Sequence, residues 1–343
     1  MPETQPRTLG VVIAGYLSDD VIVDCLESLA TSENAKLRVV VVDNASPDDT
    51  AAVIRTWATE SGRPFEEQQV GVGETAKLSA ESVFALLRLP VNLGFAGGIN
   101  TGVRALLEDP AVDLFWVLNP DCVVTPGAAA AYLRHAETTG PFALMGSRTL
   151  YHEPPQAIQT DGGRVNRWTG VCRNANQGGA PDATAMPAAN TLNFVSGANV
   201  VASRTFIERA GLLQEDYFLY FEEVDWAMRR GDLPLTMCPD ALVLHHGGTS
   251  IGTGSVTRRA SGFANYFNYR NRMRFMRRFF RLGVPSAFIY SLLKVGQLLT
   301  QRAWSEADGA LRGLLCLPPP RSVRERLSPE AARFAFGKGG RDA

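Results

Sequence analysis

Cysteine and histidine are scarce in this sequence, and no motif gathers them. There are only four histidines in 343 residues, and the five cysteines are scattered without a Cys-x-x-Cys pair: Cys25, Cys122, Cys172, Cys238 and Cys316. This pattern argues against a disulfide framework and against a zinc knuckle. Since isolated thiols are typical of reducing compartments, we expect a cytoplasmic protein with reduced cysteines.

A long uninterrupted hydrophobic run is also missing. Residues 1–8 are polar and contain no apolar core of the kind that a secretory signal has. The longest apolar stretch, Leu282–Leu299, contains Pro285 and Lys294, whereas a membrane-spanning helix needs about 20 mostly apolar residues. We therefore expect a soluble protein, or at most one that is peripheral to a membrane.

Charge is balanced over the whole chain but unevenly distributed along it. The formal net charge is −1, yet residues 1–257 carry 17 basic against 30 acidic residues and residues 258–343 carry 17 against 5. Hydrophobic residues make up 45% and charged residues 20%, as in globular proteins. The split predicts an acidic catalytic or binding body, 1–257, and a basic C-terminal region, 258–343, with a separate partner.

Short apolar runs rich in β-branched residues alternate with helical patterns in the first half of the chain. The runs are Leu9–Ala14, Leu37–Val42, Phe84–Leu89, Leu114–Leu118 and Phe142–Met145, and the helical patterns fall at about 20–32, 48–58, 98–108 and 126–138. This alternation predicts an α/β fold with a doubly wound, mostly parallel sheet. A dinucleotide-binding oxidoreductase is disfavoured, because no Gly-x-Gly-x-x-Gly follows the first strand.

The remaining segments have weaker patterns. Polar residues 59–82 are expected to form a loop, and 150–192 an irregular excursion or a short antiparallel addition that covers a cleft. A strand within 193–202, helices at 203–210 and about 221–231, and a last strand at 242–244 complete the body. Beyond residue 261 the chain is expected to be helical, aromatic and basic.

Polar residues follow four of the predicted strands, and ligands bind beyond these carboxyl ends in open α/β sheets. They are Tyr16, Asp43, the segment 92–100 with glycines at its centre, and Asp121 in an Asn-Pro-Asp turn. Each has a purely local interpretation, as a helix cap, a loop or a turn. Together they indicate a site, because glycines that open a helix can hold a diphosphate and one carboxylate with one more group can hold a divalent cation.

A second polar cluster lies among aromatic residues at 218–226. Glu222, Glu223 and Asp225 are costly to bury unless they are paired or used in chemistry. On a helix, Glu222, Asp225 and Arg229 share one face and could form an ion-pair stripe, whereas Glu223 points elsewhere. Further along, two adjacent histidines, 245 and 246, follow the last predicted strand, where metal ligation by either is open.

Six ordered motifs carry a resemblance to a known family. Over about residues 8–280 they read VVVVDNASPDD, VNLGFAGGINTG, VLNPDC, FVSGAN, DYFLYFEEVDWAMRR and LVLHHGGTS. Together they resemble glycosyltransferase family 2, most of all its bacterial rhamnosyltransferase-type members. The resemblance implies a GT-A fold, an inverting reaction, a nucleotide-sugar donor and a divalent metal, Mg²⁺ or Mn²⁺. It also implies a nucleotide-binding half, about 1–125, and an acceptor and catalytic half, 126–257.

The resemblance also implies roles for individual residues. The residues that would bind the nucleotide-sugar donor are Tyr16, Asp43, Asn92, Gly97, Asn100, Asn119 and Asp121. The metal ligands would be Asp121 and His245. The sugar and acceptor pocket would be lined by Gly197, Asn199 and Trp226. Glu223 would be the general base, with Glu222 and Asp225 as alternatives. Two departures from the family pattern matter. Asn119 replaces the first aspartate of Asp-x-Asp, which leaves one carboxylate for the metal, and Glu223 replaces an aspartate and reaches about one methylene further.

The donor and the partners are less closely specified. We expect L-rhamnose from dTDP-L-rhamnose, but a UDP-sugar donor such as galactofuranose or glucose stays open, because Asp43 would accept the same N3–H from uracil and thymine. A nucleotide-sugar-binding protein with a decayed active site is the alternative of a different class. The acceptor implied by the resemblance is a glycan or a lipid-linked glycan, and a homo-oligomer stays open.

The basic C-terminal region has two interpretations. Between Arg258 and Arg281 there are eight arginines, interleaved with aromatic residues, and no acidic residue. This segment either packs on the acidic body or, with the apolar stretch up to about 300, lies on an anionic membrane at the inner face of the cytoplasmic membrane. Nucleic acid is not expected as a partner, because no binding motif accompanies the arginines.

Overall fold

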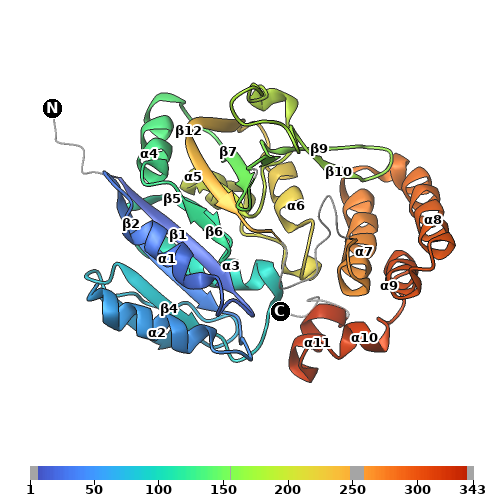
Figure 1. Cartoon of the computed structure of the whole chain (residues 1–343), viewed down its shortest axis with the longest axis horizontal. Helices are drawn as coiled ribbons and strands as arrows, with labels where there is room; N and C mark the ends of the chain where they lie inside the picture. The colour runs from blue at the N-terminus through green and yellow to red at the C-terminus, as the bar shows by residue number, and fades with distance from the viewer. Residues whose placement is uncertain (1–6, 155, 248–258, 338–343) are drawn as a thin grey trace.

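A single large sheet organises the protein. The computed structural model describes residues 7–154, 156–247 and 259–337, and within them ten strands form one sheet in the order β3-β4-β2-β1-β5-β11-β7-β12-β6, with β8 paired to β7 (Figure 1). The strands are β1 (Thr8–Gly15), β2 (Lys36–Asp43), β3 (Phe65–Gln69), β4 (Phe84–Arg88), β5 (Val112–Leu118), β6 (Cys122–Val124), β7 (Leu144–Tyr151), β8 (Ile158–Thr160), β11 (Asn199–Ser203) and β12 (Leu235–His245).

The first half of this sheet is parallel, and helices cover both of its faces. β3, β4, β2, β1 and β5 pair in parallel, whereas β11 is antiparallel to β5 and to β7. The helices of the body are α1 (Ile22–Ala30), α2 (Thr50–Ser61), α3 (Gly94–Leu107), α4 (Ala128–Thr138), α5 (Arg204–Ala210) and α6 (Glu222–Met228). One apolar layer joins the sheet to α1, α2 and α4, and another joins it to α3, α5 and α6. The predicted doubly wound α/β fold is confirmed.

Burial on both faces of the sheet explains why β1 and β2 could be predicted from the sequence. Val11 and Ile13 of β1 are buried in the layer with α1 and α2, and Val12 between them is buried in the layer with α3. A strand enclosed in this way must be apolar at every position, which gives a continuous hydrophobic run. β3 is different, because it lies at the sheet edge and pairs only with β4. Its sequence, FEEQQ, has no apolar run, so the prediction of a loop over 59–82 was wrong there.

The segment after β7 contains the expected short antiparallel addition. β9 (Gly163–Val165) and β10 (Cys172–Asn174) form a two-stranded ribbon, followed by the 3₁₀ helix η1 (Ala189–Thr191). The turn of the ribbon, 166–171, reaches away from the sheet towards the C-terminal helices (Figure 1).

The C-terminal region is helical, as predicted, and it packs on the body. Its elements are α7 (Gly262–Phe279), η3 (Arg281–Gly283), α8 (Val284–Thr300), α9 (Trp304–Leu314), α10 (Arg321–Arg324) and α11 (Pro329–Phe336), whereas the short η2 (Glu215–Tyr217) lies in the body before α6. Met273 and Phe275 of α7 are fully buried in the apolar layer that contains α6. The buried Arg270 donates to the carbonyl of Tyr217 (2.9 Å), and Arg278 pairs with Asp225 (2.9 Å).

These contacts decide between the two interpretations of α7. The buried Arg270 binds a carbonyl group of the body and the partly exposed Arg278 binds a carboxylate, so α7 is a packed helix; Arg258 lies outside the described residues. Pro285 and Lys294 also interrupt the apolar stretch Leu282–Leu299 less than the sequence suggested. Pro285 falls in the first turn of α8, where proline is tolerated. Among the described residues, one helix, Arg281–Thr300, is long and apolar enough to cross a membrane by length and composition alone.

Candidate active site

Strand pairing brings Asp121 and His245 together. Asp121 lies in the tight turn between β5 and β6, and His245 is the last residue of β12, directly opposite Cys122 in the antiparallel β6–β12 pair. Nε2 of His245 lies 3.1 Å from Oδ1 of Asp121. The neighbouring Asn119 also faces the ring, with its amide nitrogen 3.3 Å from Nε2. His245, and not His246, is therefore the histidine that the fold presents to Asp121.

Hydrogen bonds prepare both side chains for a cation. Nδ1 of His245 donates to Oε1 of Gln159 (2.6 Å), which leaves the lone pair of Nε2 directed at Asp121. The other carboxylate oxygen, Oδ2, accepts from the backbone N–H of Gly247 (3.0 Å). Burial raises the pKa of Asp121, but the charge and hydrogen bond that His245 supplies when Nε2 is also protonated, together with the Gly247 N–H, outweigh burial and lower it. An ionised carboxylate facing a lone pair needs a shared proton or a cation between them.

This donor set fits a divalent metal ion. Asp121, Cys122 and His245 offer three ligand atoms within 4.8 Å of one another. Burial raises the pKa of the Cys122 thiol well above its usual range, so the thiol stays protonated, and it donates to the carbonyl of Ala198. One carboxylate oxygen and one imidazole nitrogen remain as ligands. Such a sparse set suits an ion that also binds the phosphates of a substrate.

A second group with metal-binding composition lies beside the first. His152, Glu153 and His246 offer ligand atoms within 4.8 Å of one another, and the two imidazole rings stack with their centroids 3.8 Å apart. Backbone hydrogen bonds connect the two groups, because His152 donates to the carbonyl of His245 and His246 to that of Asp121. Glu153 is 78% exposed, so this group is at the surface.

The predicted nucleoside side of the site lies at the ends of β1, β2 and β4. Asp43 is buried, and its Oδ1 accepts from the backbone N–H of Ser46 (2.9 Å) while Oδ2 lies 3.7 Å from Nε of Arg88. Burial raises the pKa of Asp43 above its ordinary value. Burial also raises the pKa of Tyr16, which a hydrogen bond to the side chain of Asn92 lowers in part. The structure thus brings these three predicted residues to one edge of the sheet.

The glycine-rich segment opens α3, as expected, but its first N–H groups are occupied. The N–H of Leu93 donates to Asn44, that of Gly94 to Asn92, and that of Phe95 to the carbonyl of Phe218, all within 2.8–2.9 Å. Gly94 adopts φ +76°, and a Cβ there would lie 2.3 Å from the Phe218 carbonyl oxygen. A diphosphate held by these N–H groups would have to displace protein acceptors.

Two residues of α3 that are predicted to contact the donor also have structural roles. The amide of Asn100 donates to the carbonyl of Leu213 (2.9 Å) and to Glu215 (2.7 Å), and its oxygen accepts from Leu213 (3.0 Å). Asn100 is 1% exposed and has its polar atoms satisfied, so it connects α3 to the 213–215 loop. Gly97 is buried as well, and a Cβ there would lie 2.4 Å from Cβ of Leu93. Close packing within the helix accounts for this glycine.

Two predicted pocket residues lie in the core. Asn199 is 1% exposed and bonds to Trp116, Tyr132, Ser147 and Thr149 at 2.8–3.2 Å, which uses both ends of its amide. Trp226 is fully buried, and its indole N–H donates to the carbonyl of Gly211 (2.8 Å). The resemblance to the family places both in the sugar and acceptor pocket, and in the structure both also hold the fold together.

The three carboxylates of α6 have different environments. Asp225 is fully buried and bonds to Arg229 (2.7 Å), Arg278 (2.9 Å) and the hydroxyl of Tyr217 (3.1 Å). The predicted pairing with Arg229 is confirmed, but Glu222 takes no part in it. Glu222 is 3% exposed, one of its oxygens has no hydrogen-bond partner among the described residues, and burial together with the charge of Glu223 raises its pKa to about 8.

Glu223 is the carboxylate of α6 that is neither fully buried nor ion-paired among the described residues. A Cβ on Gly197 would lie 3.2 Å from Cβ of Glu223, so the glycine gives this side chain its room. Burial raises the pKa of Glu223, which improves a carboxylate as a proton acceptor near neutral pH. Burial, and after it the negative charge of Glu223, raise the pKa of the Cys172 thiol to about 12. Cys172 of β10 therefore lies near Glu223.

The chain before α6 is held in an unusual conformation. Phe218, Tyr220 and Phe221 have φ of 63°, 69° and 77°, which bulky residues rarely adopt. Asn271 of α7 holds this segment, because its amide donates to the carbonyls of residues 217, 219 and 220 at 2.7–3.0 Å. Such strain persists where surrounding packing enforces it, and it is common at functional sites. Here it fixes the direction in which α6 presents Glu223.

The sequence of residues 10–185 matches the profile described as "Glycosyl transferase family 2". That match covers just over half of the chain. The chain belongs to glycosyl transferase family 2.

Individual relatives agree with this assignment. The low-salt glycan biosynthesis hexosyltransferase Agl10 of Haloferax volcanii is 23% identical over 279 residues, which are 79% of this chain and 76% of that protein. Among solved structures, the mannosyltransferase PcManGT from Pyrobaculum calidifontis, in complex with GDP-Man and Mn²⁺, has a TM-score of 0.53 at 14% identity over 91% of this chain and 87% of that one. GalNAc-T7 with UDP, GalNAc and Mn²⁺ has a TM-score of 0.54 at 12% identity, over 79% and 51%. These similarities show the GT-A fold.

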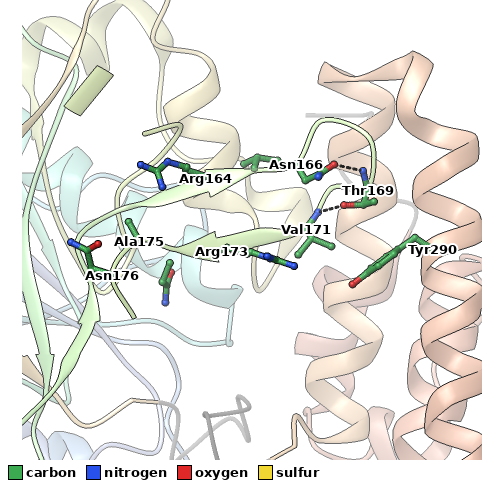
Figure 2. Close-up of a pocket in the computed structure, with 10 residues that line it drawn as sticks. Arg164, Asn166, Thr169, Val171, Arg173, Ala175, Asn176 and Tyr290 are labelled. Atoms are coloured by element: carbon green, nitrogen blue, oxygen red, sulfur yellow. Dashed lines mark hydrogen bonds between the residues drawn. The ribbon is translucent and has the colours of Figure 1, made fainter. Parts of the chain in front are cut away.

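One residue of this glycosyltransferase's site was missed from sequence. Gln159 fixes the ring of His245, but it lies in the 150–192 segment, which has no periodic pattern, so nothing in the sequence distinguished it. The same segment builds a hollow of about 580 Å³ between the ribbon and Tyr290 of α8, where Arg164 and Arg173 contribute positive charge (Figure 2). Cys172, which lies near Glu223, directly precedes Arg173 on β10.

Proposed function

We propose that this family 2 glycosyltransferase is an inverting hexosyltransferase that transfers a sugar from a nucleotide-sugar to a hydroxyl of a glycan or lipid-linked acceptor. The observation that carries this proposal is the position of Glu223. Among the described residues it is the α6 carboxylate that is partly exposed and makes no ion pair, and a glycine at 197 leaves room beside it. Asp225 is committed to two arginines, and Glu222 is neutral near pH 7, so neither is free to act as a base.

The mechanism is a single in-line displacement. Glu223 accepts the proton of the acceptor hydroxyl, whose oxygen forms a bond to the anomeric carbon while the bond to the nucleotide diphosphate breaks on the opposite side. General-base assistance of this kind contributes about 10²–10⁴-fold in rate. Asp121 and His245 would hold the divalent ion, Mg²⁺ or Mn²⁺, whose charge stabilises the leaving diphosphate. The Mn²⁺ named with PcManGT and with GalNAc-T7 supports this choice of metal.

For the donor we propose dTDP-L-rhamnose. Support comes from the resemblance to rhamnosyltransferase-type members and from the Asn-Pro-Asp sequence at 119–121. Asp43 accepts an N–H from uracil and thymine alike, so the base does not decide between dTDP- and UDP-sugars. UDP-galactofuranose and UDP-glucose are therefore the competing donors.

A donor panel tests the proposal. The protein is incubated with dTDP-, UDP- and GDP-sugars and Mn²⁺ or Mg²⁺, and release of the nucleoside diphosphate is measured with wild type, Glu223→Gln and Asp121→Asn. We expect release from dTDP-L-rhamnose that both substitutions and a chelator reduce at least about 100-fold. If UDP is released from a UDP-sugar instead, that sugar nucleotide is the donor and dTDP-L-rhamnose is not. Donor binding without release or transfer to any acceptor tested would favour a decayed enzyme.

A further inference from the structure

Helix α8 exposes its apolar side. Five large hydrophobic residues of this helix and of the turn that leads into it are exposed by 42–88%: Leu282, Ile289, Leu292, Leu293 and Leu299. The buried residues of α8, Ala287, Ser291 and Val295, recur every four positions and form the stripe that faces the protein. A helix on a protein surface normally turns its apolar side inward and its polar side to water. α8 does the reverse over much of its circumference.

Two exposed tryptophans extend this surface at the two ends of α8. Trp168, at the turn of the β9–β10 ribbon, is 56% exposed, and its carbonyl accepts from the hydroxyl of Ser286 (2.6 Å) in the first turn of α8. Trp304, the first residue of α9, is 64% exposed and follows the other end of α8. In Figure 1, α8 forms the outer edge of the molecule, and the ribbon turn reaches towards it. We call the five hydrophobic residues and the two tryptophans the α8 face.

The charged residues that flank the α8 face are basic, and they belong to a long segment without acidic residues. Exposed Arg167 adjoins Trp168, and exposed Arg281 and Arg302 flank the two ends of α8. In the sequence no acidic residue occurs between Asp240 and Glu306, where the acidic residues of α9 begin. An apolar strip with tryptophans at its ends and basic residues around it matches the boundary between acyl chains and anionic headgroups.

We propose that the α8 face docks on the surface of an anionic lipid bilayer, with α8 lying in the plane of the interface. Trp168 and Trp304 would sit at headgroup level, and the leucines and Ile289 would enter the acyl boundary. A lateral position suits α8 better than a crossing one, because its Ala287–Ser291–Val295 stripe is buried against the protein. This surface differs from the arginine-rich α7 segment, in which Arg270, Arg274 and Arg278 bind the body. The bilayer would be the inner face of the cytoplasmic membrane.

Vesicle co-sedimentation of the full-length protein tests this proposal. Vesicles of phosphatidylglycerol and phosphatidylcholine in equal parts are compared with vesicles of phosphatidylcholine alone. We expect binding to the anionic vesicles, released as salt rises. The double substitution Ile289→Asp and Leu293→Asp should weaken binding at least about tenfold. The matched control is Val72→Asp, since Val72 is 49% exposed but lies in the loop after the edge strand β3, outside the α8 face; it should bind as wild type does.

Charge and orientation have separate readouts. Arg167→Gln and Arg281→Gln should each weaken binding about fivefold at low salt, the effect of about 1 kcal/mol per basic residue. Alkaline carbonate should extract the bound protein, whereas retention would mean that α8 crosses the bilayer. Equal recovery on anionic and neutral vesicles, or unchanged binding of the double variant, would refute the proposal. Light scattering tests the alternative occupant. If wild type does not bind vesicles but forms a stable dimer, and the double substitution dissociates that dimer, the α8 face binds a second copy of this chain.

Discussion

Nε2 of His245 lies 3.1 Å from Oδ1 of Asp121, and the other nitrogen of the same ring donates to Gln159 at 2.6 Å. The relationship depends on three separate parts of the chain: the turn after β5, the end of β12 and strand β8. Gln159 fixes which nitrogen carries the proton, and so leaves Nε2 free as a ligand. The metal-binding capacity of Asp121 and His245 therefore depends on a residue that need not touch the metal.

This dependence gives the first prediction. Gln159→Ala should lower the affinity for Mn²⁺, measured by calorimetric titration in the presence of the nucleoside diphosphate, by about 10–100-fold, because the ring loses its orienting acceptor. Gln156→Ala is the matched control, since Gln156 is exposed in the loop before β8. If the two variants bind Mn²⁺ equally well, with intact folds in thermal melts, Gln159 does not support the site.

The second prediction separates the two adjacent glutamates. Glu223→Gln cannot accept a proton and should lower kcat by about 10²–10⁴-fold while the affinity for the donor stays within a few-fold. Glu222→Gln should keep most of the activity, because the pKa of about 8 leaves Glu222 protonated near pH 7, and a neutral amide resembles a neutral acid. Both variants are measured at pH 7 under single-turnover conditions. An inactive Glu222→Gln beside an active Glu223→Gln would reverse the assignment.

A pH dependence of stability follows from the same pKa of Glu222. Between its ordinary value of 4.5 and the folded value of about 8, the folded protein retains a proton that the unfolded chain has released. This group therefore lowers the free energy of unfolding progressively as pH rises through that window. Glu222→Gln should remove the loss and be more stable than wild type by roughly 3–5 kcal/mol at pH 8, but not at pH 4. Urea titrations at the two pH values measure the difference, and parallel profiles of the two proteins would contradict it.

Features set by local sequence could be predicted, and features set by distant contacts could not. β1 and β2 are enclosed between two apolar layers, so their sequence had to be continuously hydrophobic. β3 is an edge strand with a half-exposed face, and its polar sequence resembles a loop. The strand-end position of Asp121 and His245 followed from the alternation of strands and helices. Their mutual approach depends on the β6–β12 pairing, which no local pattern encodes.

Three of the predicted site residues are bonded to the protein itself, and they share one physical feature. Asn100, Asn199 and Trp226 are polar or aromatic residues within motifs, and each could equally serve a ligand or the fold. In the structure their polar atoms bond to the protein, for example Asn100 to Leu213 and Trp226 to Gly211. Burying such groups is tolerated only when they are hydrogen-bonded, and the partners come from loops that the sequence does not place. Motif membership alone does not tell a buried anchor from a contact residue.

The last prediction concerns Asp225, which couples α6 to α7. Its two carboxylate oxygens bind Arg229 at 2.7 Å and Arg278 at 2.9 Å, and the group is fully buried. Asp225→Asn keeps the shape but removes the charge that both guanidinium groups face, and breaking a buried pair by removing one partner costs about 3–5 kcal/mol. We expect a loss of this size in the free energy of unfolding. Arg278→Met should cost less, because the side chain of Arg278 is 40% exposed and Arg229 still pairs with Asp225. A loss of activity in Asp225→Asn without any loss of stability would instead make Asp225 part of the catalytic machinery.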